Sequence, residues 1–189
     1  MKTQRGFSMI EVVVTIAIMG ILMAAAMPSV GDWLRNAKVR NTADSLLNGL
    51  QQARSVAVNR NRPTTLYLVN NLTGSCALSN AAGSWVVSHA SPVGQCDSTT
   101  VVLAKGSVLD GGGATVTASQ SNYSAGATAV TFNGLGMLAQ SSLSTAIRRI
   151  VVASADGSYD LRIEISPGGA ARLCEPRIDT TGDSRKCLQ

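Results

Sequence analysis

The sequence predicts an α+β fold in which a long N-terminal helix packs on an antiparallel β-sheet. Two observations support this class. Residues 7–62 hold a long apolar run followed by apolar residues at spacings of three and four, which is typical of a helix. After residue 62, short segments alternate apolar and polar residues with the period of two that β-strands show. With 189 residues and 45% hydrophobic content, the chain can form one modest domain and an accessory element.

The helix begins with a strongly apolar segment. Residues 7–27 contain one charged side chain, Glu11, and as a helix they are long enough to cross the hydrocarbon core of a bilayer. A conventional secretory signal peptide is the alternative, because the three alanines at 24–26 fit the small-residue cleavage site of such signals. A carboxylate inside an apolar segment, however, is costly and usually functional.

Residues 6–11, with the sequence GFSMIE, resemble the type III signal of type IV pilins and type II secretion pseudopilins. The resemblance implies that a prepilin peptidase cuts between Gly6 and Phe7, so that residues 1–6 are a leader peptide, and that the new amino group on Phe7 is methylated. It also implies that the Glu11 carboxylate pairs with the N-terminal amine of a neighbouring subunit. The physical chemistry agrees, because removing one partner of a buried ion pair costs roughly 3–5 kcal/mol.

The same resemblance divides the helix into two parts. Residues 7–30 form the transmembrane and assembly half, and residues 31–62 form an amphipathic half. Pro28 lies where the family has a proline. It is predicted to break or bend the helix, because proline removes a backbone hydrogen bond, or else to occupy the first turn of a second helix. Residues 31–62 carry six Lys or Arg and two Asp, so most of the net charge of +5 lies there.

The amphipathic half has one apolar face, and Pro63 ends the helix. Most of its basic side chains occupy the other face. The apolar face is therefore predicted to cover the sheet. Its residues are Ala43, Leu46, Leu47, Leu50, Ala53 and Ala57.

Residues 63–189 are predicted to form a globular β-sheet domain. The clearest pair of strands flanks Asp156-Gly157, which is a hairpin signal. Residues 70–84 and 110–126 are rich in Gly, Ser, Ala and Asn and are predicted to be long surface loops. Candidate strands are residues 64–69, 85–87, 100–103, 129–132, 148–153, 159–165 and 171–174.

Four cysteines lie in turn-rich sequence and predict disulfides in an oxidising compartment. They permit three pairings. We favour Cys76 with Cys96 and Cys174 with Cys187, because each pair closes a short local loop, the second at the C-terminus. A zinc site is disfavoured, because the chain has no C-x-x-C pair and a single histidine, His89.

The order of helix, antiparallel sheet, residues 131–134 before the last hairpin and a C-terminal cysteine pair resembles the GspH, FimT and FimU-like minor pilins. This resemblance implies a minor pilin of a type IV pilus, involved in pilus assembly or priming and in twitching motility, adhesion or DNA uptake. The alternative is a GspH-like minor pseudopilin of a type II secretion system.

The resemblance also implies a location and a set of partners. The protein is expected to pass once through the inner membrane with its globular domain in the periplasm, and to enter the pilus filament or its tip after assembly. Its expected partners are the prepilin peptidase, other pilin subunits, the pilus assembly machinery and the inner membrane.

DNA is a further partner to consider. Some FimT-like pilins that this chain resembles bind DNA through a basic G-R-x-R motif before a cysteine, and residues 169–174 (GAARLC) keep only the second arginine. Clustered cations suffice for phosphate contact, but interleaved acidic residues leave residues 172–189 at a net charge of +1, and no aromatic side chain lies there. A solvated, disulfide-closed terminus is therefore favoured. The candidate DNA-binding residues are Arg172, Arg177, Arg185 and Lys186.

The sequence indicates no enzyme, no cofactor and no metal site. His89 has no evident nucleophile partner. Residues 134–139 (GLGMLA) fit a dinucleotide-binding fingerprint formally, but a hairpin follows them instead of a parallel crossover unit. Arg148 and Arg149 are neighbours on a predicted strand, so their side chains are expected on opposite faces and not in one patch.

Overall fold

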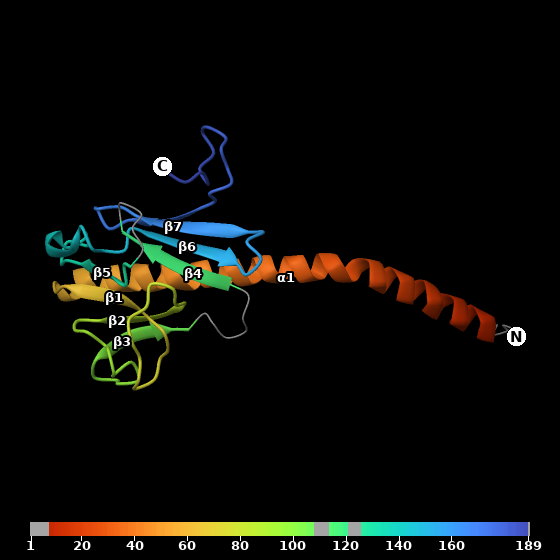
Figure 1. The fold of residues 1–189 in the computed structure, drawn as a ribbon, viewed down its shortest axis with the longest axis horizontal. Helices are drawn as coiled ribbons and strands as arrows, with labels where there is room; N and C mark the ends of the chain where they lie inside the picture. The colour runs from red at the N-terminus through yellow and green to blue at the C-terminus, as the bar shows by residue number, and fades with distance from the viewer. Residues whose placement is uncertain (1–7, 108–113, 121–125, 189) are drawn as a thin grey trace, which may run out of the picture. The chain divides into compact units, whose positions relative to one another are not determined.

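The computed structural model describes residues 8–107, 114–120 and 126–188, with the backbone alone at 25–29 and 142. The chain divides into two compact units, Met1–Arg35 and Asn36–Gln189. Along the sequence (Figure 1) the elements are α1 (Met9–Arg60), β1 (Thr64–Val69), β2 (Ser84–Ser88), β3 (Val102–Gly106), β4 (Ala114–Ser119), β5 (Ala129–Phe132), the 3₁₀ turn η1 (Gln140–Ser142), β6 (Arg149–Ser154), β7 (Asp160–Ile165) and β8 (Ala171–Cys174).

Helix α1 is continuous over 52 residues, so the expected break at Pro28 is not found, and no second helix begins there. Proline lacks an N–H group, so one backbone hydrogen bond is lost, but the apolar and alanine-rich residues around it favour a helix enough to continue it. The helix ends as predicted. Asn61 takes a positive φ of 44°, the N–H of Arg62 donates to the Ala57 carbonyl oxygen, and Pro63 cannot extend the helix.

The unit Asn36–Gln189 contains two antiparallel sheets where one was expected. Sheet A has the strand order β3-β2-β1-β5, and sheet B has the order β4-β6-β7-β8. In sheet A, Thr65 pairs with both Ser88 and Thr131. In sheet B, β6 and β7 form the predicted hairpin, and Gly157 in its turn has a φ of +69°. The α+β class, with a helix packed on antiparallel sheet, is confirmed.

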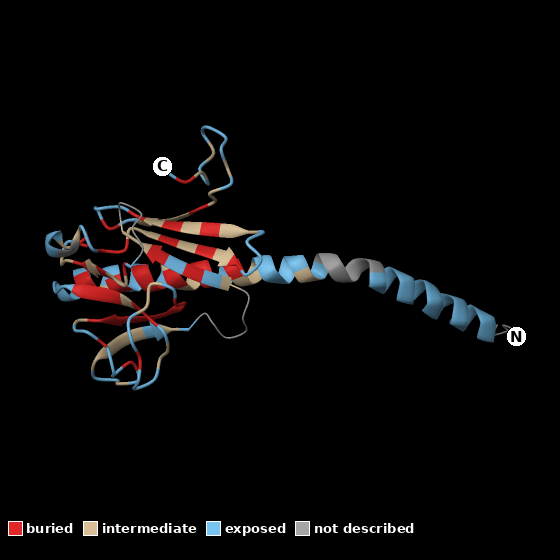
Figure 2. Ribbon diagram, in the orientation of Figure 1, coloured by how far each residue is buried: buried red, intermediate tan, exposed pale blue. Residues whose placement is uncertain are grey.

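One hydrophobic core joins the helix to both sheets. Figure 2 shows the buried face of α1 lying against the strands. Five of the six predicted face residues are fully buried, and Leu47 is half-buried. Each fully buried large apolar side chain contributes about 1.5–3 kcal/mol to the free energy of folding. This face therefore accounts for much of the energy that holds α1 against the sheets. The largest buried side chains include Leu46, Leu50, Leu66, Leu68, Phe132, Ile147, Ile150, Leu161 and Ile163.

Three polar contacts add to this packing. Trp85 Nε1 donates to Ser45 Oγ at 3.2 Å, and Arg54 Nε donates to the Gly136 carbonyl oxygen at 2.9 Å. Arg40 Nη2 donates to the Tyr159 hydroxyl oxygen at 3.1 Å, and this hydrogen bond raises the pKa of the Arg40 guanidinium. These bonds tie α1 to β2, to the segment after β5 and to the residue before β7.

The prediction of a loop over residues 110–126 was wrong in its middle. Strand β4 lies there and pairs with β6 over its whole length, from Ala114 opposite Ser154 to Ser119 opposite Arg149. Its residues are small or β-branched, so that neighbouring positions differ little in hydrophobicity and no strand pattern is evident in the sequence. In the structure, buried and exposed positions do alternate along β4, and Val116 is one of the buried residues. The other predicted loop, residues 70–84, holds one isolated bridge, between Val69 and Leu78, before β2 begins.

Candidate functional site

The processing residues Gly6 and Phe7 lie outside the described residues, so cleavage and methylation stay predictions. Glu11 lies in the first turn of α1, where its N–H donates to the Ser8 carbonyl oxygen at 3.0 Å. Its carboxylate forms no ion pair with any residue that the structure describes. The pairing of this carboxylate with a neighbouring subunit stays a prediction.

The helix around Glu11 is apolar on every side. All residues from 8 to 24 are exposed, including Met9 at 87% and Ile21 at 70%. A helix that is hydrophobic all round is stable only when an apolar environment surrounds it. In the described part of the chain, none of the helices combines the length and the apolarity that crossing a bilayer requires. Among the residues that the structure describes, none covers the apolar surface of residues 8–24.

At the C-terminus, the structure brings the predicted cations against acceptors of the same chain. Arg172 donates through Nε and Nη2 to Glu164 Oε2, at 3.2 and 3.0 Å, and through Nη2 to the Lys186 carbonyl oxygen at 3.0 Å. Arg177 Nε donates to Asp160 Oδ1 at 2.8 Å. Both arginines are thus held by acidic residues of β7.

The last two cations are also bonded. Arg185 donates to both carboxylate oxygens of Asp183, and this hydrogen bonding lowers the pKa of Asp183 and raises that of Arg185. Lys186 Nζ donates to the Asp179 carbonyl oxygen at 2.8 Å. The four predicted DNA-binding side chains therefore do not form a row of unpaired charges.

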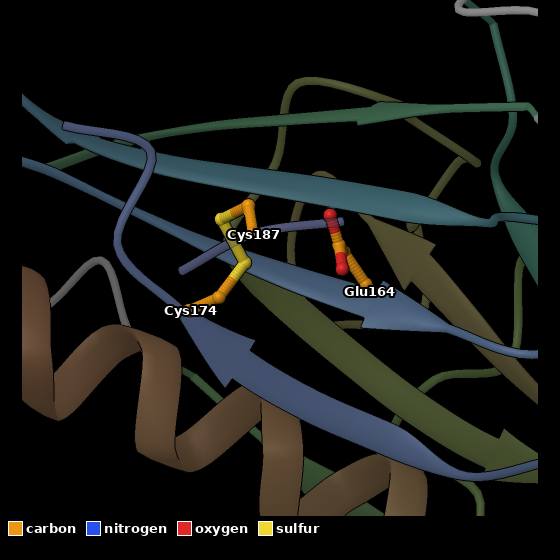
Figure 3. A group of neighbouring side chains, drawn as sticks. All are labelled: Glu164, Cys174 and Cys187. Carbon is orange, nitrogen blue, oxygen red and sulfur yellow. A yellow bond between two sulfur atoms is a disulfide. The ribbon is translucent and has the colours of Figure 1, made fainter. Parts of the chain in front are cut away.

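Both predicted disulfides are confirmed. Cys76 is joined to Cys96 and Cys174 to Cys187, with sequence separations of 20 and 13. Figure 3 shows the second bond beside Glu164, whose carboxylate lies within 4.8 Å of both sulfur atoms. Such a trio resembles a metal site in composition. The sulfur atoms are bonded to each other, however, and are not thiolates that can ligate a metal.

A cavity that no sequence pattern indicated lies at the edge of sheet B, with a volume of about 330 Å³. Three arginines, Arg148, Arg149 and Arg172, are among the residues that line it. Arg148 and Arg149 were expected not to form one patch, yet both border this cavity; β6 begins at Arg149, so Arg148 lies just before the strand. The lining residues are Gln120, Arg148, Arg149, Glu164, Ile165, Ser166, Pro167, Ala170, Arg172 and Leu188.

Two family profiles match the chain. The family described as "Type II transport protein GspH" matches residues 42–169, and the "Prokaryotic N-terminal methylation motif" matches residues 1–27. The first match covers more than half of the chain. The chain therefore belongs to the GspH family, within the class of type IV minor pilins and pseudopilins.

Individual relatives give shorter or more distant matches. A fimbrial protein from Moraxella nonliquefaciens is 42% identical over 60 residues, which are 32% of this chain and 37% of that protein, so the match spans little more than a third of the relative. Two crystal structures of the type IV minor pilin FimU from Pseudomonas aeruginosa are similar at 20% and 18% identity. They cover 71% and 75% of this chain and 90% and 91% of their own, with TM-scores of 0.46 and 0.48.

Proposed function

We propose that this chain is a minor subunit of a type IV pilus, with a structural and not a catalytic role. One observation carries the proposal. Within the segment that matches the N-terminal methylation motif, the helix from Met9 onward exposes apolar side chains on all sides and carries one charge, Glu11, without a partner among the described residues. Such a helix is built to be surrounded by lipid or by other apolar helices.

The proposed assembly depends on one ion pair between neighbouring subunits, and each subunit supplies both an amine and a carboxylate. Cleavage between Gly6 and Phe7 creates an amine, and methylation leaves its positive charge in place. In the filament, this amine meets the Glu11 carboxylate of a neighbouring subunit among apolar side chains. Because an unpaired charge there is strongly disfavoured, the pair sets the register between subunits. Before assembly, the same helix anchors the subunit in the inner membrane, with the globular domain in the periplasm.

A pseudopilin of a type II secretion system is the competing role within the same family. The match to a fimbrial protein favours the pilus. The two roles separate in a strain from which this chain is deleted. Loss of surface filaments and twitching motility with normal protein secretion supports the pilus, and the reverse result assigns the chain to secretion.

DNA capture receives less support. A DNA backbone needs several accessible cations, and Arg172, Arg177, Arg185 and Lys186 each already bind an acceptor of their own chain. We therefore do not include DNA uptake in the proposed role.

Intact mass and N-terminal sequencing of the protein recovered from membranes test the proposal directly. In cells with prepilin peptidase we expect a chain that begins at methylated Phe7, and in cells without it an uncut chain. A chain that begins after the alanines at 24–26 would identify an ordinary signal peptide, and the filament role would be wrong.

A further inference from the structure

An exposed apolar cluster lies where α1 ends, in the unit Asn36–Gln189. It consists of Val58, Leu135 and Met137, whose exposed fractions are 47%, 75% and 42%. Val58 lies two residues before the end of α1, and the other two residues lie in the segment that follows β5 (Figure 1). Large apolar side chains that stay exposed beside one another are a mark of interaction sites, because burial in the core does not account for them.

Close packing at Gly136 brings the three side chains together. Arg54 Nε donates to the Gly136 carbonyl oxygen at 2.9 Å. A Cβ atom added at Gly136 would lie 3.0 Å from Arg54 Nε and 3.0 Å from Val58 Cγ2. The backbone between Leu135 and Met137 therefore rests directly on α1, next to the Val58 side chain.

Hydrogen bonds hold this segment in one conformation. Asn133 Oδ1 accepts from the N–H of Leu135 at 2.9 Å and from the N–H of Met137 at 3.1 Å. The Asn133 N–H donates to the Met137 carbonyl oxygen, and the Gly136 N–H donates to the Asn133 carbonyl oxygen, both at 2.9 Å. Because the backbone is already ordered, a partner that binds Leu135 does not have to offset the entropy of fixing a loop.

Three arginines border the apolar cluster. Arg54 is bonded to the segment itself, through a neutral carbonyl that leaves its charge in place. Arg60 and Arg62 lie beside the segment, because Gly134 packs directly against Asn61, the residue between them. All three arginines are exposed, and none forms an ion pair with a residue that the structure describes. The border of the cluster is therefore positively charged.

The chain itself offers a poor complement to this surface. Residues 45–96 and 133–155, which include the end of α1 and the segment after β5, contain no Asp or Glu. The whole unit Asn36–Gln189 has 13 Lys or Arg and nine Asp or Glu, a net charge of +4, so two copies repel each other. The matching surface is therefore expected on a different protein, as an apolar pocket bordered by Asp or Glu.

We propose that the apolar cluster of Val58, Leu135 and Met137 binds such a pocket on a different subunit of the filament. That the partner is a filament subunit rests on the proposed function. An apolar centre with a charged border is the usual arrangement of a protein interface. Nucleic acid matches the cluster less well, because bases stack on aromatic rings and the cluster is aliphatic.

Site-specific photo-crosslinking of the full chain in the cells that produce it tests this surface. The photoreactive residue p-benzoylphenylalanine replaces Leu135, and mass spectrometry identifies the partner and the crosslinked segment. We expect a product with another protein that carries the N-terminal methylation motif, joined at a segment with Asp or Glu beside aliphatic residues. The same residue in place of Leu78, a leucine outside the cluster that is 39% exposed, should not give this product.

Charge reversal makes the test specific. With the crosslinker at position 135, Arg60→Glu combined with Arg62→Glu should lower the yield of the product at least about tenfold, because like charges then face each other. Lys105→Glu reverses an exposed cation on β3 and should leave the yield unchanged. Replacing the acidic residues of the identified segment by Arg should restore the yield with the double variant, which excludes a folding defect as the cause of the loss.

Absence of the product, or an undiminished yield with the double variant, would overturn the proposal. A product with a second copy of this chain, with lipid or with nucleic acid would contradict it as well. Mass spectrometry of the same sample shows where the chain begins. If a chain that begins at Phe7 gives no product, only this surface is wrong, whereas a chain that begins after the alanines at 24–26 contradicts the proposed function.

Discussion

At the residue scale, one tryptophan determines how closely α1 approaches sheet A. A Cβ atom added at Gly49 of α1 would lie 2.9 Å from Cδ2 and Cε2 of Trp85, and one added at Gly106 of β3 would lie 2.6 Å from Cε2 and Cζ2 of the same ring. The indole therefore fills the space between two glycines. Any larger side chain at either position must move the ring or separate the helix from the sheet.

We expect Gly49→Ala to destabilise the protein by about 1–3 kcal/mol, as overpacking of a core typically does. The direction of the change in stability is informative, because replacing Gly by Ala inside a helix ordinarily stabilises a protein by about 1 kcal/mol. Urea unfolding measures the change. Gly31→Ala is the matched control, since the nearest atom to its new Cβ is 4.0 Å away, and it should cause no loss. Equal stability of the two variants would show that the Trp85 contact is not tight.

We expect Glu164→Gln to loosen the C-terminal tail, because the carboxylate accepts from both Arg172 and the N–H of Leu188. The loss should be about 1–3 kcal/mol, the typical cost of weakening a buried charged hydrogen bond. Hydrogen exchange at the Leu188 amide measures it. Arg177→Gln breaks a more exposed pair with Asp160 and should cost about 0–1 kcal/mol. Similar effects of both changes would contradict this account.

At the element scale, the segment between β1 and β2 depends on a cross-link more than on packing. Residues 70–83 contain no strand, and the local core beneath them consists of Val69, Cys76, Val86 and Cys96. So small a cluster contributes little burial energy. The disulfide between its two cysteines, with a separation of 20 residues, therefore supplies much of the local stability.

Replacing both Cys76 and Cys96 by alanine should lower the free energy of unfolding by about 3 kcal/mol, because the unfolded chain regains the entropy of an open loop. Urea unfolding of the full chain in detergent measures this. Ser75→Ala, next to the cross-link and exposed, should change stability by no more than about 0.5 kcal/mol. An unchanged midpoint in the double variant would mean that the loop stays ordered without its bond.

At the scale of the whole molecule, two kinds of surface are separated along the sequence. Residues 8–24 expose apolar side chains on all sides, whereas the unit Asn36–Gln189 encloses its own core. The first surface requires other molecules and the second does not. Variants of the N-terminal segment should therefore affect assembly without affecting the stability of the globular unit.

Glu11→Gln tests this separation. The chain should still be processed and its disulfides should form, but incorporation into sheared filaments should fall by about a hundredfold or more, because the neighbouring amine is left unpaired among apolar side chains. Immunoblots of filament and membrane fractions measure the ratio. Thr15→Ala removes a hydroxyl that, among the described residues, donates to the Val12 carbonyl oxygen of its own helix, and this variant should assemble normally. Normal incorporation of Glu11→Gln would contradict the pairing.

Sequence patterns predicted the secondary structure well where the contrast between apolar and polar residues was strong. The strands at residues 64–69, 129–132 and 171–174 have the predicted bounds, and the hairpin around Gly157 forms as expected. Strand β4 was missed because small residues give weak contrast. Its pairing with β6 is what completes sheet B, and that pairing joins residues 30 to 40 positions apart, from Ser119 with Arg149 to Ala114 with Ser154.

The sequence by itself determined what depends on near neighbours along the chain: the apolar N-terminal helix with Glu11, the amphipathic face of α1, and disulfides that close short loops. Only the tertiary structure decided the division into two sheets, the pairing of Arg172 with Glu164, and the cavity that brings Arg148 toward the C-terminal tail. The physical reason is that strand pairing determines which charged side chains from distant parts of the sequence lie next to each other. A net charge counted along the tail includes neither Glu164 nor Asp160, since both carboxylates lie on β7.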